Sequence, residues 1–384
     1  MRKLRLGMVG GGPGSFIGAV HRIAARMDNY YELIAGTFSS SLEKSLETGK
    51  ELGLDESRIY PSYQELILKE KEKPANERIQ VIAIVTPNHL HFGPAKMALE
   101  NGFHVVLDKP ITLSLAEALS LQEIQKKTGN LLCLTHTYTG YPMVKEAKQQ
   151  VASGRLGKIR KVYVEYPQGW LSNVVENKQA TWRTDPSKSG IAGAMGDIGT
   201  HAFNLAEYVT GLAVKKLCAD INTVVENRKL DDDGAVLLKF NNGASGVLMA
   251  TQIAAGEENN IKIRVYGEKG GLEWQQVDAN TLTLKWLDAP AQTYCTGNGY
   301  LSSFAQHNTR TPSGHPEGYL EAFANIYKNF AEHILALQDK IEPKKESLDY
   351  PSITEGVRGM AFIETVIASG KSDQKWLDLH EGSK

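Results

Sequence analysis

Short apolar runs alternate with helical patterns through the first third of the chain, and this alternation restricts the fold more than any other feature of the sequence. The run 81–85 contains only apolar side chains, which is typical of a strand covered on both faces. Further strand candidates lie at 4–9, 31–35, 104–107 and 131–135, with helical patterns between them. Strands and helices in this order predict βαβ units and a parallel sheet.

The pattern changes after residue 136, where we expect a first domain (1–136) to end and a second domain (137–384) to begin. Between 214 and 286, strand candidates follow one another, and Asn-Gly and Gly-Gly turns supply the backbone freedom that hairpins need. Helical patterns lie at 319–338 and 354–369. The sequence therefore predicts an α+β second domain with a mainly antiparallel sheet.

The charge balance argues against nucleic acid and anionic membranes as partners. The chain has 43 basic and 44 acidic side chains and a net charge of -1, so we expect a small-molecule partner instead. Its three cysteines, Cys133, Cys218 and Cys295, are sparse and widely spaced, which indicates reduced thiols. No apolar leader precedes the first strand candidate, and 81–85 is too short to span a bilayer. We expect a soluble, cytoplasmic protein.

A glycine-rich segment, Gly-Gly-Gly-Pro-Gly-Ser-Phe-Ile-Gly at 10–18, connects the first strand to the first helix. Glycines at this turn let a pyrophosphate approach the backbone, and the helix N-terminus attracts its charge. Five residues, rather than two, separate Gly12 from Gly18, and a turn without a ligand is the alternative interpretation. The residues expected to contact the cofactor here are Gly10, Gly12, Gly14, Ser15, Phe16 and Ile17.

The end of the second strand usually carries an acidic residue that binds the ribose of NAD. Residues 36–40 contain neither an acid nor an arginine. Ser39 and Ser40 are the candidates to bind a ribose hydroxyl or a 2′-phosphate, with Lys44 one turn further on. We expect NAD or NADP as the cofactor and favour NAD.

Two polar segments follow neighbouring strands, at the edge where ligands bind in parallel sheets. Thr-Pro-Asn-His-Leu-His at 86–91 follows the run 81–85, and Asp-Lys-Pro at 108–110 follows the next strand. A lysine in this place can bind a substrate hydroxyl and stabilise negative charge on its oxygen. The alternatives are an ordinary Pro-Asn loop and a solvated lysine. The cofactor contacts expected here are Thr86, Pro87, Asn88, His91, Asp108 and Lys109.

The segment Gly-Asp-Ile-Gly-Thr-His at 196–201 places Asp197 and His201 four residues apart at the start of a predicted helix, so that they share one face. A histidine can accept a hydroxyl proton, and a nearby carboxylate can orient it or bind a hydroxyl. Two alternatives are that Asp197 is only a helix N-cap, or that the pair binds a metal. No third ligand candidate is close in sequence, so we expect no metal.

These segments, in this order and over essentially the whole chain, resemble the Gfo/Idh/MocA family of oxidoreductases, which includes glucose–fructose oxidoreductase and inositol dehydrogenases. Asp108 stands where the family usually has Glu, and the long glycine loop and the acid-free second strand are further departures. The resemblance implies that Lys109 anchors the substrate, that Asp197 is its partner and that His201 is the acid–base residue. It also implies an N-terminal Rossmann domain with a parallel sheet, followed by an α+β domain with a large open sheet that binds substrate and forms homodimers or homotetramers.

Further substrate-binding candidates lie in the second domain. The tryptophans Trp170 and Trp182 could stack on a sugar face, and Arg183 could donate two hydrogen bonds to a substrate. Tyr138 begins the domain, and His315 precedes a predicted helix. Each of these residues could equally be a packing or capping residue.

The sequence therefore predicts an NAD(P)-dependent dehydrogenase. It would oxidise a secondary hydroxyl of a cyclic polyol, sugar or glycoside, with Lys109, Asp197 and His201 as its catalytic residues. Two alternatives remain: a glycosidase that uses NAD without net oxidation, and an NAD(P)-binding sensor without turnover.

Overall fold

A computed structural model describes residues 2–175 and 177–381, which divide into two compact units. The first unit takes the chain up to Thr112, together with Ala116–Thr137 and Tyr319–Val357, and the second takes the rest. Residues 319–357 thus count with the first unit, whereas the sequence assigned them to the second domain. The reason is the helix at 319–339, whose side chains Phe323, Tyr327 and Phe330 share a hydrophobic core with Val20 and Ala24 of the first helix.

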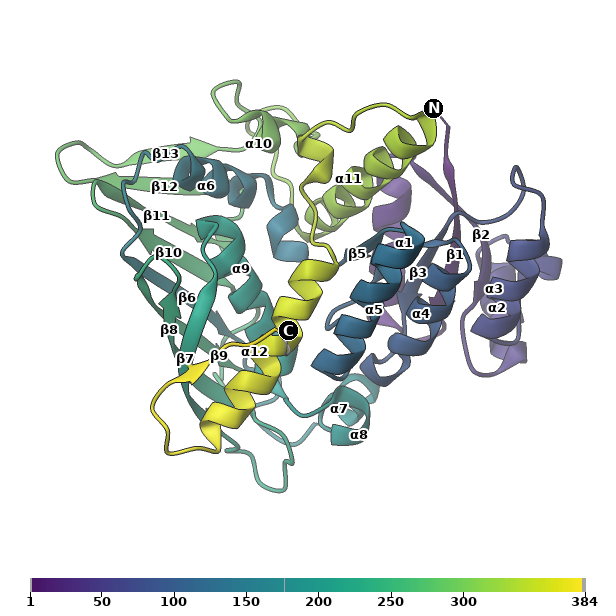
Figure 1. The fold of residues 1–384 in the computed structure, drawn as a ribbon, viewed down its shortest axis with the longest axis horizontal. Helices are drawn as coiled ribbons and strands as arrows, with labels where there is room; N and C mark the ends of the chain where they lie inside the picture. Colours follow the sequence, from purple (N-terminus) through teal and green to yellow (C-terminus); the bar gives the residue numbers. More distant parts are fainter. Residues whose placement is uncertain (1, 176, 382–384) are drawn as a thin grey trace. The chain divides into compact units, whose positions relative to one another are not determined.

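The first unit contains a sheet and the helices around it (Figure 1). Its strands are β1 (Leu4–Gly10), β2 (Tyr31–Thr37), β3 (Val81–Val85), β4 (His104–Leu107) and β5 (Leu132–Leu134). Its helices are α1 (Phe16–Met27), α2 (Leu42–Glu51), α3 (Tyr63–Glu72), α4 (Phe92–Glu100), most of α5 (Leu115–Thr128) and α11 (Tyr319–Asp339), with short 3-10 turns η1 (Glu56–Arg58), η2 (Asn88–Leu90) and η6 (Glu346–Leu348).

The sheet of the first unit has the strand order β2-β1-β3-β4-β5, and each neighbouring pair is parallel. Every residue of β3 is buried, because β1 and β4 flank it and side chains cover both of its faces. The predicted parallel α/β arrangement is therefore confirmed. The carboxyl ends of these strands lie at one edge of the sheet.

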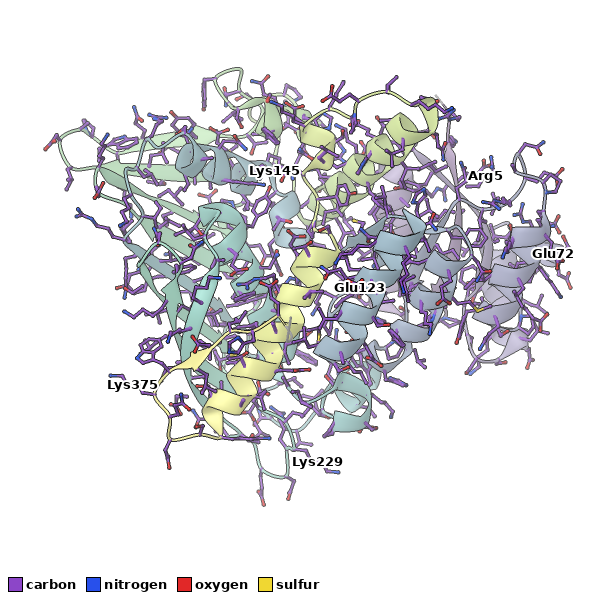
Figure 2. The ribbon with its side chains drawn as sticks, viewed as in Figure 1. Arg5, Glu72, Glu123, Lys145, Lys229 and Lys375 are labelled. Atoms are coloured by element: carbon purple, nitrogen blue, oxygen red, sulfur yellow. The ribbon has the colours of Figure 1, made fainter. Side chains whose placement is uncertain are left out.

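The segment before β3 is fastened by charged side chains. Arg5 of β1, labelled in Figure 2, donates from Nε to the carbonyl of Arg78 (2.6 Å) and from Nη2 to the carbonyl of Ala75 (2.7 Å). The carboxylate of Glu70 in α3 is fully buried and accepts hydrogen bonds from Arg58 and from the hydroxyl of Tyr60. These contacts position a segment for which the sequence analysis predicted no helix.

The second unit contains a larger sheet. Its strands are β6 (Lys161–Pro167), β7 (Val214–Asn222), β8 (Asp233–Phe240), β9 (Ser245–Thr251), β10 (Lys262–Tyr266), β11 (Gly270–Gln275), β12 (Thr281–Trp286), β13 (Gln292–Cys295) and β14 (Leu377–Asp378). Its helical elements are α6 (Pro142–Ala152), α7 (Lys178–Arg183), α8 (Pro186–Ser189), the π-helix η4 (Met195–Gly199), α9 (Thr200–Thr210), α10 (Ser303–His307) and η5 (Gln276–Asp278). The turn η3 (Thr137–Gly140) and helix α12 (Ile353–Gly370) begin in the first unit and continue in the second.

The strand order of this sheet is β13-β12-β11-β10-β6-β9-β8-β7-β14, with β6 and β9 parallel and the other pairs antiparallel. Buried and exposed residues alternate along β8, so the sheet has one covered face and one open face. Helices α6 and α9 contact the sheet on the covered side (Figure 1). The mainly antiparallel open sheet is confirmed.

A buried carboxylate holds the turn that carries Asp197. The side chain of Asp231 accepts hydrogen bonds from the backbone N–H groups of Gly193 (2.6 Å) and Met195 (2.7 Å), and its carbonyl accepts one from Ala194 (2.8 Å). A Cβ atom on Gly193 would lie 2.1 Å from that carbonyl oxygen, so the close approach requires glycine. Asp197 lies inside the π-helix, which runs directly into α9. The alternative that Asp197 is a helix N-cap is therefore wrong.

Within the described part of the chain, no helix is both long enough and apolar enough to cross a membrane.

The role of Asp231 predicts the effect of an isosteric change. Asp231→Asn would turn one of the two accepting oxygens into an NH₂ group that faces a backbone N–H. We expect a loss of about 1–3 kcal/mol in the free energy of unfolding, measured by chemical denaturation. Asp288→Asn, in the exposed loop between β12 and β13, is the matched control and should change it by less than about 0.5 kcal/mol. Equal stability of the two variants would contradict this role of Asp231.

Candidate functional site

The glycine loop packs tightly between β1, β2 and α1. The N–H of Gly12 donates to the carbonyl of Phe38 at 3.1 Å, and a Cβ atom on Gly12 would lie 2.5 Å from that oxygen. A Cβ atom on Gly18 would lie 2.5 Å from the Cα atom of Gly11. These approaches require glycine at both positions, and they bring the loop against the end of β2.

Helix α1 begins within the predicted phosphate-binding segment, earlier than the sequence indicated. Ser15 is its N-cap, and the Ser15 Oγ accepts from the N–H of Gly18 at 3.2 Å. The N–H groups of Phe16 and Ile17 belong to the first helical turn, which has no intrahelical acceptors for them. Together with the backbone at Gly10, Gly12 and Gly14, this helix start fits the pyrophosphate of a dinucleotide. Arg22, which the sequence analysis missed, donates to the carbonyl of Gly11 at 2.8 Å and fixes the loop from α1.

The two serines after β2 differ in their surroundings. The Oγ of Ser39 accepts from the N–H of Ser41 at 3.2 Å, so that hydroxyl is engaged in the turn. Ser40 is exposed. Ser41 is the N-cap of α2 and accepts from the N–H of Lys44 at 3.4 Å. At this place Ser40 is thus the serine whose side chain the turn leaves accessible.

The predicted residues after β3 and β4 lie together. Pro87 precedes η2, Asn88 is buried, and the hydroxyl of Thr86 donates to the carbonyl of Leu90 at 3.2 Å. The ring of His91 reaches across to the segment after β4, where its Nδ1 lies 2.8 Å from the carbonyl oxygen of Pro110. The structure therefore brings together the two motifs that the sequence placed at one edge of the sheet.

The carboxylate of Asp108 joins β4 to β5. Its Oδ1 accepts from the hydroxyl of Thr135 at 2.8 Å and from the N–H of Lys109 at 2.9 Å. His136, the second residue after β5, is buried and was not among the residues predicted from the sequence. Burial and, to a lesser extent, the charge of Lys109 lower the pKa of His136 to about 3, and the carboxylate of Asp108 acts in the opposite direction. The uncharged imidazole of His136 thus lies near enough to the ammonium of Lys109 to interact with it electrostatically.

In the second unit, Asp197 lies among several predicted residues. Its Oδ2 accepts from Nε2 of Gln252 at 2.9 Å and forms an ion pair with Nε of Arg183 at 3.3 Å. The guanidinium carbon of Arg183 lies 4.4 Å from the ring centre of Trp182 and 6.0 Å from that of Trp170. The structure thus brings Trp170, Trp182 and Arg183 to Asp197, as a group in which the charge of Arg183 is paired.

Three amide side chains connect this group to the rings around His201, and we call Gln168, Gln252 and Asn259 the amide chain. The indole of Trp170 can only donate, and it donates to Oε1 of Gln168 at 3.0 Å. Nε2 of Gln168 therefore points to Oδ1 of Asn259, at 2.5 Å. The carboxylate of Asp197 can only accept hydrogen bonds. The NH₂ group of the Gln252 amide, and not its oxygen, must therefore face Asp197.

The far end of the amide chain reaches two tyrosines. The hydroxyl of Tyr166 donates to Oδ1 of Asn259 at 2.7 Å and is hydrogen-bonded to the hydroxyl of Tyr138, which also accepts from Nδ2 of Asn259 at 3.3 Å. The ring of Tyr138 meets the buried ring of His201 edge to face, with centres 4.9 Å apart. Nε2 of Gln252 also lies 3.5 Å from Oε1 of Gln168, so polar and aromatic contacts link Asp197 to His201 through the amide chain.

His315 is not part of this group. It lies in an exposed loop, where its Nδ1 is 3.3 Å from the carbonyl oxygen of Pro312. Within residues 2–175 and 177–381, no contact joins it to the amide chain, and no set of three or more potential metal-ligating His, Cys, Asp or Glu side chains gathers at one place.

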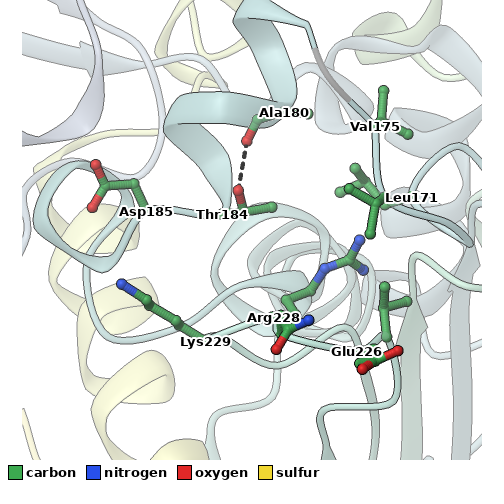
Figure 3. A pocket seen from close by; sticks show the side chains of 11 residues that line it. Leu171, Val175, Ala180, Thr184, Asp185, Glu226, Arg228 and Lys229 are labelled. Atoms are coloured by element: carbon green, nitrogen blue, oxygen red, sulfur yellow. Dashed lines mark hydrogen bonds between the residues drawn. The ribbon is translucent and has the colours of Figure 1, made fainter.

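A separate cavity of about 370 Å³ lies beside the segment that carries Trp170 and Arg183 (Figure 3). Arg228 at its edge pairs with the buried carboxylate of Asp232 at 3.2 Å. The residues that line the cavity are Leu171, Val174, Val175, Ala180, Thr184, Asp185 and residues 225–229. None of the predicted site residues is among those lining residues.

Comparison with known proteins agrees with this organisation. Residues 4–136 match the family described as an oxidoreductase family with an NAD-binding Rossmann fold, and residues 144–273 match the GFO/IDH/MocA C-terminal domain. An uncharacterized oxidoreductase of Bacillus subtilis, YfiI, is 33% identical to the chain, over 98% of this chain and 97% of the relative.

Solved structures extend the similarity to the whole fold. The crystal structure of an oxidoreductase from Sinorhizobium meliloti is 43% identical, with a TM-score of 0.88 over 98% of this chain and 100% of that one. An inositol dehydrogenase homolog from Azotobacter vinelandii, complexed with NAD⁺, is 34% identical, with a TM-score of 0.92 over 98% and 97%. An inositol dehydrogenase homolog from Azotobacter vinelandii complexed with NADH and myo-inositol is 33% identical, with a TM-score of 0.89 over 98% of each chain. The chain therefore belongs to the Gfo/Idh/MocA family of oxidoreductases, and its residues 4–136 form the NAD-binding Rossmann fold of such an enzyme.

Proposed function

We propose that the protein is a dehydrogenase that oxidises a secondary hydroxyl of an uncharged cyclic polyol, sugar or glycoside, with NAD as the hydride acceptor. The observation that carries the proposal is the connection of Asp197 and His201 to the amide chain and to two tyrosine hydroxyls. A relative of the same fold has been solved with NADH and myo-inositol, which agrees with a substrate of this class.

Each catalytic residue has a defined task in this mechanism. His201 accepts the proton of the substrate hydroxyl, and the ammonium of Lys109 donates a hydrogen bond to the same oxygen and stabilises its negative charge. The carboxylate of Asp197, which Gln252 and Arg183 hold in place, binds a substrate hydroxyl and keeps the substrate oriented. The O–H and C–H bonds break, a C=O bond forms, and the hydrogen leaves carbon with its electron pair.

The cofactor site uses the first unit. Nicotinamide, when bound, supplies the acceptor of the hydride. The loop at Gly10, Gly12 and Gly14 and the start of α1 would hold the pyrophosphate, and Ser40 is the accessible serine that could bind a ribose hydroxyl. The absence of an arginine in residues 36–40 favours NAD over NADP.

The charge of the group around Asp197 favours an uncharged substrate. A phosphorylated or carboxylated substrate would need a further cation, because Arg183 is paired with Asp197 and Lys109 is assigned to the oxygen that is oxidised. Side-chain amides both donate and accept, as sugar hydroxyls do, so the amide chain is suited to a ring with several hydroxyl groups.

The test of this function is the reduction of NAD by a panel of inositols, aldoses, glycosides and their phosphates, followed by absorbance. We expect an uncharged member of the panel to support steady reduction. His201→Asn should lower kcat by about a hundredfold or more, since it removes the proton acceptor. His380→Asn, an exposed histidine near the end of the chain, should leave kcat unchanged.

Other results would exclude the proposal. Cleavage of a glycoside with no net reduction of NAD would identify the enzyme as a redox-neutral glycosidase. Binding of NAD with no turnover of any panel member would indicate a sensor. Preference for a phosphorylated sugar would contradict the assignment of an uncharged substrate.

We also propose that the chain forms a homodimer or homotetramer through the open face of the larger sheet. Side chains on this face are only partly covered within one chain, including Tyr163, Val247, Met249 and the 45% exposed Leu237. A central apolar strip of this kind is typical of subunit interfaces.

The oligomer can be tested by light scattering after size-exclusion chromatography. Val247→Glu places a charge in the middle of the face and should convert the oligomer to monomers. Val277→Glu makes the same change at a 68% exposed valine on η5 and should leave the oligomer intact. A monomeric wild-type protein, or an oligomer that survives Val247→Glu, would contradict the proposed interface.

A further inference from the structure

His91 has both of its ring nitrogens in contact with backbone carbonyls. Its Nδ1 lies 2.8 Å from the carbonyl oxygen of Pro110, and its Nε2 lies 2.9 Å from the carbonyl oxygen of Thr86. The side chain is only 1% exposed. Carbonyl oxygens accept hydrogen bonds and cannot donate them, so both nitrogens face acceptors of the chain itself.

The two carbonyls belong to segments that carry predicted site residues. Thr86 directly follows β3, and Pro110 directly follows Lys109 after β4. On the N-terminal side, the N–H of Lys109 donates to the carboxylate of Asp108. That carboxylate also accepts from the hydroxyl of Thr135, the residue that follows β5. The backbone is therefore fixed immediately before and immediately after Lys109.

The sequence predicts that His91 contacts the cofactor, but the geometry of the His91 ring favours another role. A ring whose two nitrogens are used inside the chain has no polar atom left for a nucleotide. We propose that His91 is a positioning residue, which ties the segment after Lys109 to the end of β3 and so fixes the lysine, and that it does not bind the dinucleotide. This inference rests on the proposed function, in which Lys109 acts on the substrate.

Histidine suits this role because its rigid ring has a nitrogen on each side. A neutral ring carries one N–H and donates to one carbonyl at a time, whereas the charged ring donates to both. Burial lowers the pKa of His91, and His89 lowers it too, while the carboxylate of Asp108 and the two carbonyls raise it. A glutamine could keep one of the two contacts, and a phenylalanine could keep neither.

The first test compares His91→Phe and His91→Gln with the wild type. We expect His91→Phe to lower kcat at saturating NAD by about tenfold to a hundredfold, because displacement of a catalytic group by about 1 Å has effects of this size. The Kd of NAD, measured by calorimetry, should stay within about twofold. His91→Gln should recover part of kcat. His380→Phe, at an exposed histidine near the end of the chain, should change neither quantity.

The second test asks whether His91 acts through Lys109. In a Lys109→Met background, His91→Phe should cause little further loss of the residual rate, since two residues that act as a unit have non-additive effects. Single-turnover reduction of NAD at high enzyme concentration measures this rate. If His91→Phe does not fold, as judged by thermal unfolding, His91→Gln in the two backgrounds gives the same comparison.

The outcomes separate this inference from the proposed function. A large rise in the Kd of NAD with an unchanged kcat would make His91 a cofactor contact. Independent, additive losses from His91→Phe and Lys109→Met would mean that His91 acts elsewhere. Both results would leave the role of Lys109 intact. Full activity in Lys109→Met alone would overturn that role and the inference together.

Discussion

The parallel pairing of β3 with its neighbours is the constraint on which the first unit depends. Val81–Val85 is buried throughout, and its register sets Val85 beside Gly10 of β1 and Ile84 beside Leu107 of β4. The strands therefore end at one level, and the segments that follow them meet at the same edge of the sheet. The glycine loop, the motif at 86–91, the Asp-Lys-Pro segment and His136 owe their proximity to this register. The apolar core thus brings charged and hydrogen-bonding side chains to one edge of the sheet. Local contacts, such as those of Asp108 and His91, then fix the orientation of these side chains.

The second unit orients its chemical groups by a different means. Asp197 and His201 lie on a π-helix and the following α-helix, a local geometry that is common at functional sites. The start of that π-helix is held by Asp231, a buried carboxylate that satisfies backbone donors. Polar groups fixed in this way need little reorganisation when charge develops on a substrate oxygen, which is the condition for effective electrostatic stabilisation.

Features that depend on the spacing of apolar and polar residues within a short segment were predictable from the sequence. The apolar strands, the two types of sheet and the motifs near Asn88, Lys109 and His201 follow from patterns within a few residues. Helix α3 was missed because one of its inward positions is Glu70, whose burial depends on Arg58 and Tyr60. The edge strand β13 was missed because its residues are polar and largely exposed. Helix α11 was predicted as a helix, but its packing in the first unit depends on contacts far apart in the sequence. The amide chain has no local signal, because Gln168, Gln252 and Asn259 meet only when the strands have paired.

In the proposed reaction, hydrogen moves as hydride from a carbon of the substrate to the nicotinamide. The most direct measurement uses the accepted substrate with deuterium on the carbon that is oxidised, and determines by mass spectrometry whether NADH formed in the reaction contains the label. The proposed mechanism predicts one deuterium per NADH and a slower rate of reduction than with the unlabelled substrate. NADH that contains no deuterium, formed while the labelled substrate is consumed, would contradict direct transfer and with it the assigned reaction.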